Sequence, residues 1–164
     1  MASNVKKEFE LYEPMRKWLH TYLSDKYKGW EVITVDSHAR TLDLYLEEYG
    51  VISEYPYTVG LDIQIDVLGI IKRDGKSKIV FIEAKKTQLT LRDLGQLWAY
   101  CKLCKPLEAF LLSSCGLGSL NKIFLNLGRT DLLNYGHDGL VDTMFVGKWD
   151  LTTNSIEYKS IIPK

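Results

Sequence analysis

Two acidic residues and one lysine interrupt a pair of otherwise apolar segments near the middle of this chain. Residues 62–71 contain Asp66, and residues 79–85 contain Glu83 and Lys85. A charge that an apolar strand carries into a protein must be matched by an opposite charge, a metal ion or a substrate. These three residues are therefore the first candidates for chemistry in the chain.

A hairpin is predicted between the two segments, because Asp74 and Gly75 separate them. Both central residues of a type I′ turn have positive φ, which an Asp-Gly pair tolerates. This loop sets Asp66 opposite Glu83, where Cβ atoms lie roughly 4.5–5.5 Å apart and like charges repel. The carboxylate pair therefore needs a cation. One or two carboxylates with water and a substrate phosphate are the ligands that Mg²⁺ prefers, and Lys85 would lie beside that ion.

Side-chain alternation along the strands predicts two faces of the hairpin. One face has Leu68, Ile70, Ile79, Phe81 and the three charged residues, and the other has Ile65, Val67, Val80, Ile82 and Ala84. Asp62 is a rival acid, but it lies about 13 Å from Asp66 along an extended strand at ~3.3 Å per residue. The register favours Asp66. In the alternative interpretation, Lys85 only bridges the two acids as a cross-strand ion pair worth ~0.2–1 kcal/mol.

The Glu83-Ala84-Lys85 triplet, the apolar strand before it and Asp66 resemble the motif of the PD-(D/E)XK nuclease superfamily, whose fold is restriction-endonuclease-like. The resemblance covers residues 61–112. It implies that Asp66 and Glu83 hold Mg²⁺, for which Mn²⁺ would substitute. It also implies that Lys85 orients or activates the attacking water and stabilises the pentavalent phosphorus.

A helix is predicted over residues 90–103, with Thr90 as its N-cap and Asp93 completing a capping box. Gln96 and Tyr100 lie one turn apart on this helix. They resemble a Gln-x-x-x-Tyr motif of some recombination and repair nucleases, which implies that Gln96 assists catalysis and Tyr100 is accessory. Alternatively, Gln96 faces solvent and Tyr100 is an ordinary aromatic of the core or its rim.

An earlier helix is predicted over residues 5–28, with its regular part beginning at Pro14. Many members of the superfamily place a Glu of the first helix near the metal. Glu8, Glu10 and Glu13 are the candidates here, and we favour Glu13. A Glu at this position would otherwise serve the helix macrodipole and the free amides.

Charge is balanced over the whole chain, with 21 basic and 21 acidic residues, but it is unevenly distributed. Acids dominate residues 36–66, and bases dominate residues 72–105. A basic surface beside the proposed site would bind nucleic acid, and Lys86 and Arg92 are the candidates for it. The alternative is that these charges are the solvated ends of a hairpin and a helix.

Cysteine and histidine add no further site to the predictions. Three cysteines at positions 101, 104 and 115 argue against a disulfide scaffold or a four-cysteine cluster. His20, His38 and His137 are far apart in sequence, so we interpret them as surface or loop residues. The Gly116-Leu117-Gly118 run lacks the third glycine of a dinucleotide fingerprint, so no nucleotide cofactor is expected.

The 164 residues predict one α/β domain with an αβββαβ core, in which helices flank a mixed central sheet. The core covers residues 5–114. Residues 115–164 form an extension that ends in a β-hairpin of residues 144–150 and 155–162. This extension would serve as a dimer surface, a DNA-reading element or a cover for a sheet edge. No leader and no apolar run of about 18–20 residues is seen, so a soluble cytoplasmic protein without a membrane partner is expected.

Together these features predict a Mg²⁺-dependent DNA endonuclease of the restriction or the repair and recombination type, with DNA as its partner and a homodimer as one option for its assembly. One alternative is a catalytically inactive nucleic-acid-binding or complex-subunit module with the same fold. Another is an interaction domain in which the charges of Asp66, Glu83 and Lys85 pair across the strands without a function.

Overall fold

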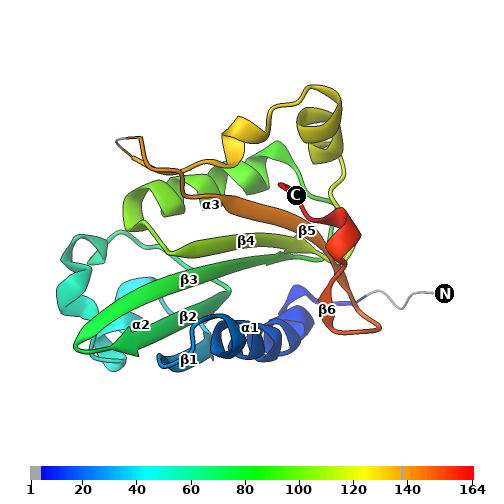
Figure 1. Ribbon diagram of the computed structural model, residues 1–164. Helices are drawn as coiled ribbons and strands as arrows, with labels where there is room; N and C mark the ends of the chain where they lie inside the picture. The colour runs from blue at the N-terminus through cyan, green and yellow to red at the C-terminus, as the bar shows by residue number, and fades with distance from the viewer. Residues whose placement is uncertain (1–4, 138) are drawn as a thin grey trace.

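One mixed β-sheet with helices on both faces organises the chain, as a computed structural model of residues 5–137 and 139–164 shows (Figure 1). The α/β class predicted from sequence is confirmed. The strands in sheet order are β1 (Glu31–Asp36), β2 (Val67–Arg73), β3 (Lys76–Lys85), β4 (Glu108–Ser113), β5 (Met144–Asp150) and β6 (Ser155–Ile156). The helices are α1 (Tyr12–Lys26), α2 (Leu42–Glu48) and α3 (Leu91–Cys104).

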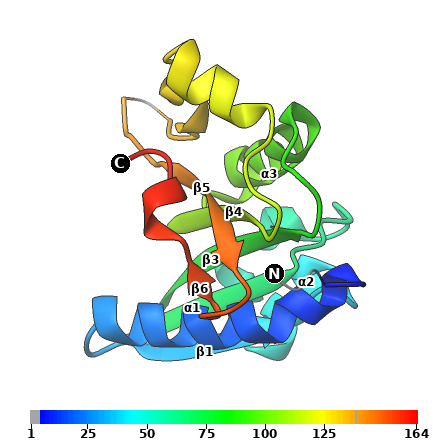
Figure 2. The same cartoon turned by 90° about the vertical axis from the view of Figure 1, so that its right-hand side faces the viewer.

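The predicted hairpin forms between β2 and β3 with the expected register. Arg73 pairs with Lys76 and Ile70 pairs with Ile79 in an antiparallel ladder. Asp74 and Gly75 between them have φ values of 52° and 75°, as a tight turn requires. The strands β1 and β2 are also antiparallel, whereas β3, β4 and β5 are mutually parallel. The carboxyl ends of β3, β4 and β5 therefore lie together at one edge of the sheet. This edge faces the viewer in Figure 2.

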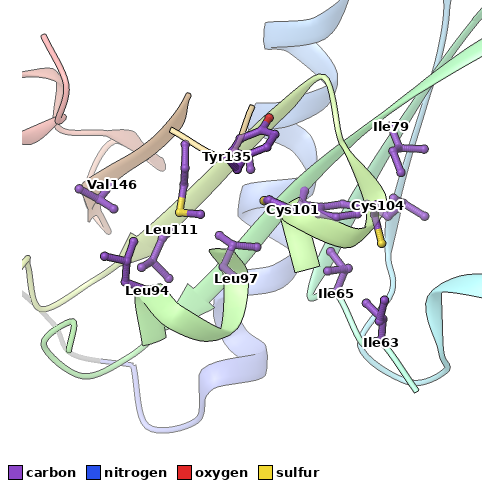
Figure 3. Packing of buried hydrophobic residues seen from close by; sticks show 14 of the residues in the cluster. Ile63, Ile65, Ile79, Leu94, Leu97, Cys101, Cys104, Leu111, Tyr135 and Val146 are labelled. Atoms are coloured by element: carbon purple, nitrogen blue, oxygen red, sulfur yellow. The ribbon is translucent and has the colours of Figure 1, made fainter. Parts of the chain in front are cut away.

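Two apolar layers cover the two faces of the sheet. Met15, Leu19 and Leu23 of α1 pack against the face that carries Val67, Val80 and Ile82. On the other face, Leu94, Leu97, Cys101 and Cys104 of α3 pack with Ile79 and Leu111, as Figure 3 shows. Burial raises the pKa of both thiols, to about 11 for Cys104, so these two cysteines serve as small apolar groups.

The predicted start of β2 was wrong, and with it the face assigned to Ile65. The strand begins at Val67, and Ile63 and Ile65 pack into the α3 layer instead. Their carbonyls accept hydrogen bonds from groups outside the neighbouring strand. The N–H of Leu42 donates to Ile63 O, and the Ser37 hydroxyl donates to Ile65 O. Asp62 is exposed with a φ of 54°, so the rival acid lies outside the strand.

The helix boundaries follow from local signals. Thr90 and Asp93 form the predicted capping box, in which Asp93 N–H donates to the Thr90 hydroxyl at 3.3 Å. Within the helix predicted over residues 5–28, the regular part begins at Tyr12, two residues before Pro14, and a 3₁₀ turn at Glu8–Leu11 leads into it. Pro14 lies in the first turn of α1, where no intrahelical donor is needed. The 3₁₀ turn at Glu8–Leu11 packs against β3.

The predicted C-terminal hairpin forms, but its second strand is shorter than expected and its first strand belongs to the main sheet. Strand β5 pairs in parallel with β4, and only the two residues of β6 pair with β5 in antiparallel fashion. Ile162 forms a further bridge to Val146. Residues 144–150 are therefore an integral strand of the sheet, and residues 115–143 connect β4 to it through a π-helical turn and a 3₁₀ turn. Across the described residues, no helix is long and apolar enough to cross a membrane.

A buried carboxylate ties α1 to β4. Glu108 is 5% exposed and accepts hydrogen bonds from the hydroxyls of Tyr22 at 2.6 Å and Tyr27 at 2.5 Å. Lys26 Nζ lies 3.1 Å from the same carboxylate. Burial and the hydrogen bond to Glu108 raise the pKa of both phenols, which keeps them neutral donors. Because the carboxylate is satisfied by these partners, it anchors the helix whose other end carries Tyr12.

Candidate functional site

Two carboxylates meet at the carboxyl end of β3. Asp66 directly precedes β2, Glu83 lies in β3, and the hairpin register brings their side chains together so that Asp66 acts on the pKa of Glu83. The N–H of Ala84 donates to Asp66 Oδ2 at 2.8 Å, which fixes the Asp66 side chain across the strand gap. The hairpin register thus brings together the two acids that the sequence singled out.

Negative charge exceeds positive charge at this pair of carboxylates. Glu83 is only 4% exposed, and burial raises its pKa well above the usual glutamate value. The neighbouring charge of Asp66 and the hydrogen bond with it raise the pKa further, whereas the charge of Lys85 lowers it. Without another cation, Glu83 therefore holds its proton at a pH where an ordinary glutamate has lost it.

Lys85 ends β3 two residues beyond Glu83 and is half-buried. Its backbone carbonyl accepts a hydrogen bond from Ser114 N–H at 3.1 Å, which continues the β3–β4 pairing. The ammonium acts on the Glu83 carboxylate through its charge. Lys85 is therefore available to a substrate beside the carboxylate pair.

The N-terminal turn adds a third acid and a tyrosine to this cluster. Glu8 Oε2 accepts a hydrogen bond from Lys86 N–H at 3.3 Å, and its charge raises the pKa of both Glu83 and Tyr12. Tyr12 is 6% exposed, and burial is the largest cause of its raised pKa, followed by the charge of Asp66. The Tyr12 hydroxyl therefore stays neutral beside the Asp66 carboxylate.

Glu13, which the sequence argument favoured, lies apart from this cluster. It pairs with Arg16 at 2.7 Å across one helical turn, and its side chain is 54% exposed. Among the three acids considered, the structure brings Glu8 to the carboxylate pair. Sequence reasoning chose wrongly because it began the helix at Pro14, and so missed the preceding 3₁₀ turn that points Glu8 toward β3.

Gln96 and Tyr100 lie one turn apart on α3, and Tyr100 is partly buried against the core. Gln96 is exposed, and its Nε2 donates to the Tyr100 hydroxyl at 3.2 Å. The opposite side of the helix, with Leu94 and Leu97, faces the sheet. The hydrogen-bond partner of Gln96 is thus Tyr100, and the catalytic role of Gln96 stays a prediction. A contact of either side chain with DNA stays a prediction.

A groove of about 790 Å³ opens next to the cluster, at the edge where β3, β4 and β5 end. Lys86 and Lys148 line it together with Thr87, Thr90 and Ser114. A second groove of about 550 Å³ shares Gln88, Cys115 and Lys148 with the first and adds Lys159 and Lys164. Four lysines thus line a continuous surface beside the cluster, with Asp150 and Glu157 as its acids. Arg92, the other predicted contact, is exposed on the first turn of α3.

Sequence reasoning missed one neighbour of the cluster. His38, interpreted from sequence as a surface or loop residue, follows β1 and has its Nδ1 2.5 Å from Asp36 Oδ1. Its ring centroid lies 4.8 Å from that of Tyr12. An Asp-x-His spacing at the end of a strand was the available signal, but only the pairing of β1 with β2 brings it beside Asp66.

The donor set at the cluster suits a hard divalent ion. Asp66 and Glu83 offer oxygen ligands only, and burial together with the charge of Asp66 raises the pKa of Glu83, as expected where negative charge is incompletely matched. Within residues 5–137 and 139–164, no three His, Cys, Asp or Glu side chains form a ready-made metal cage. Mg²⁺ commonly takes one or two carboxylates and completes its shell with water and substrate oxygens, so these residues fit that ion.

Comparison with known proteins adds no assignment. No protein-family model matches the chain, and neither a search of curated proteins nor one of solved structures finds a match.

Proposed function

We propose that the protein is a Mg²⁺-dependent nuclease that hydrolyses phosphodiester bonds in DNA. The observation that carries the proposal is the contact between Asp66 and Glu83 at the end of β3, with Lys85 two residues further along that strand. Resemblance of this motif to the PD-(D/E)XK superfamily supports the same conclusion. The element order of helix, three strands, helix and strand is also the one that the superfamily core would have, with α2 inserted.

Each residue of the cluster has a distinct role in the proposed reaction. Asp66 and Glu83 would hold the ion, and the amide of Ala84 orients Asp66. When bound, Mg²⁺ neutralises charge on the phosphoryl oxygens and makes water a better nucleophile. Lys85 adds a fixed positive charge where the attacking water and the phosphorane develop negative charge. Glu8 holds the backbone of Lys86 and adds to the negative charge of the pocket.

A basic surface next to the cluster supports nucleic acid as the substrate class. The lysines of the two grooves lie at the carboxyl edge of parallel strands, where α/β proteins commonly bind ligands. Phosphates on either side of the scissile bond would contact these lysines. Phosphate contacts position the strand without reading its sequence.

Substitutions in the grooves are expected to weaken DNA binding without changing the cluster. The double variant with Lys86→Glu and Lys148→Glu loses two phosphate contacts. The slope of the logarithm of the DNA-binding constant against the logarithm of salt concentration should therefore become less steep by about 1.8. Fluorescence anisotropy at several salt concentrations, with a labelled duplex and without divalent ions, measures this change. Lys78→Glu is the matched control, because Lys78 is exposed at the turn end of the same strand β3. Equal salt slopes in all three proteins would contradict the assignment of the grooves.

A panel of DNA substrates tests the proposed function. The purified protein is incubated with supercoiled plasmid, linear duplex, single strand and four-way junction, in Mg²⁺, Mn²⁺ or EDTA. Cleavage that needs the metal supports the nuclease, and the preferred substrate names its subclass. DNA binding without cleavage of any substrate would favour the catalytically inactive module instead.

A further inference from the structure

The end of β1 delivers an aspartate–histidine pair to the edge of the cluster. Asp36 Oδ1 lies 2.5 Å from His38 Nδ1, and the two side chains are 34% and 45% exposed. A carboxylate at Nδ1 orients the imidazole and leaves Nε2 as the ring nitrogen that can act on a substrate. Because the side chain is partly exposed, Nε2 is accessible to a substrate.

Backbone and ring contacts fix this histidine beside the carboxylate pair. Ser37 N–H donates to Asp66 O at 2.9 Å, so the residue before His38 is bound to one of the proposed metal ligands. The His38 ring packs on Tyr12, whose pKa is raised by burial and by the nearby charge of Asp66. The imidazole thus contacts Tyr12 and follows directly after a residue that is hydrogen-bonded to Asp66.

The sheet order places His38 and Lys85 on opposite sides of Asp66. His38 follows β1, Asp66 precedes β2 and Lys85 ends β3, and these strands are adjacent in that order. The lysine-lined grooves continue on the Lys85 side, along β4 and β5. Displacement at phosphorus proceeds with the attacking and leaving oxygens roughly in line, so a group on the far side from the activated water faces the leaving oxygen.

We propose that His38, oriented by Asp36, is the general acid that protonates the leaving oxygen. The inference rests on the nuclease function proposed above. The oxygen of water forms a bond to phosphorus and releases a proton to solvent. The bond from phosphorus to the bridging oxygen breaks, its electron pair goes to that oxygen, and the oxygen takes the proton from His38 Nε2. Solvent then returns a proton to the imidazole.

Substrates with a bridging sulfur test this role, because a leaving thiolate is stable without a proton. Single-turnover cleavage is compared between an oxygen diester and its 3′- and 5′-bridging phosphorothiolates, using the linkage that the wild type cuts.

His38→Asn keeps an amide that can reach Asp36 but cannot supply the proton. We expect it to slow cleavage of the oxygen substrate by about 10²–10⁴-fold. The sulfur substrate should be cut within about tenfold of the wild-type rate, since no acid is needed there. Asp36→Asn should show the same pattern with a smaller loss.

His20→Gln is the matched control, because His20 is an exposed histidine of α1 whose nearest polar partner is Thr34. Melting temperature and Mn²⁺ affinity should be the same in His38→Asn and the wild type. Equal losses on oxygen and sulfur substrates would assign His38 a positioning role and overturn the inference, as would an unchanged rate on the oxygen substrate. A wild type that cuts none of the substrates would overturn the proposed function itself.

Discussion

Replacing Lys85 with methionine should lower the single-turnover rate of DNA cleavage by about 10²–10³-fold, the usual cost of removing one group that stabilises developing charge. Methionine keeps most of the length and apolar stem of the side chain while removing its charge. The half-buried position at the end of β3 therefore stays filled. Quenched-flow or manual single-turnover assays on the preferred DNA, with Mg²⁺ in excess, measure the rate.

Metal binding should survive this substitution, which separates loss of chemistry from loss of the site. Lys85 lowers the pKa of Glu83 through its charge, so removing it makes the carboxylates no weaker as a cation site. Lys78→Met is the control, because it alters an exposed lysine on the same strand away from the cluster. A Lys85→Met protein that cleaves at the wild-type rate would show that Lys85 has no catalytic role and would favour the ion-pair interpretation.

The second large effect concerns stability without metal, where Glu83→Gln should be more stable than the wild type at neutral pH. Burial and Asp66 raise the pKa of Glu83 in the folded chain above its unfolded value. Between those two values the folded chain keeps a proton that the unfolded chain has released, so stability falls as pH rises. Above that window the folded wild type bears a buried charge, which glutamine cannot acquire.

Thermal unfolding in EDTA at several pH values measures this difference. A gain of at least about 1 kcal/mol is expected near neutral pH, from the cost of a poorly matched buried group. For a chain of this length, each kcal/mol raises Tm by roughly 2–4 °C. The difference should vanish below about pH 4, where an ordinary carboxyl is protonated in both states. Glu47→Gln, an exposed acid of α2, is the control. A less stable Glu83→Gln protein at neutral pH would contradict the charge balance described for the cluster.

Added Mg²⁺ should reverse the order of stability. An ion that binds only the folded chain stabilises it by about 2.7 kcal/mol at a hundred times its Kd. The wild type should gain this stabilisation, whereas Glu83→Gln, with one ligand lost and one negative charge fewer, should gain little. Equal stabilisation of the two proteins would place any metal site elsewhere.

The hairpin and α3 were predictable because their signals are local. Asp74 and Gly75 specify the turn, and the turn together with strand alternation specifies the register that opposes Asp66 to Glu83. Thr90 and Asp93 specify the start of α3 through side chains three residues apart. Such signals need no knowledge of the rest of the fold.

The remaining parts of the cluster depend on packing that no local pattern encodes. Glu8 reaches β3 only because a 3₁₀ turn precedes α1 and α1 packs across the sheet. His38 reaches Tyr12 because β1 pairs with β2, and the isolated Asp-x-His spacing predicts no such neighbour. The start of β2 was missed because Ile63 and Ile65 alternate with polar residues as a strand would, although their partners are loop groups.

Binding of Mn²⁺ tests the central claim most directly, because it examines the Asp66–Glu83 pair without requiring a known DNA substrate. Titration followed by the paramagnetic resonance signal of the free ion counts the ions bound per chain. The wild type and Lys85→Met should bind Mn²⁺, whereas Asp66→Asn and Glu83→Gln should lose most of that affinity. Equal Mn²⁺ affinity in all four proteins would show that the two carboxylates do not form a metal site, and the nuclease proposed here would lose its basis.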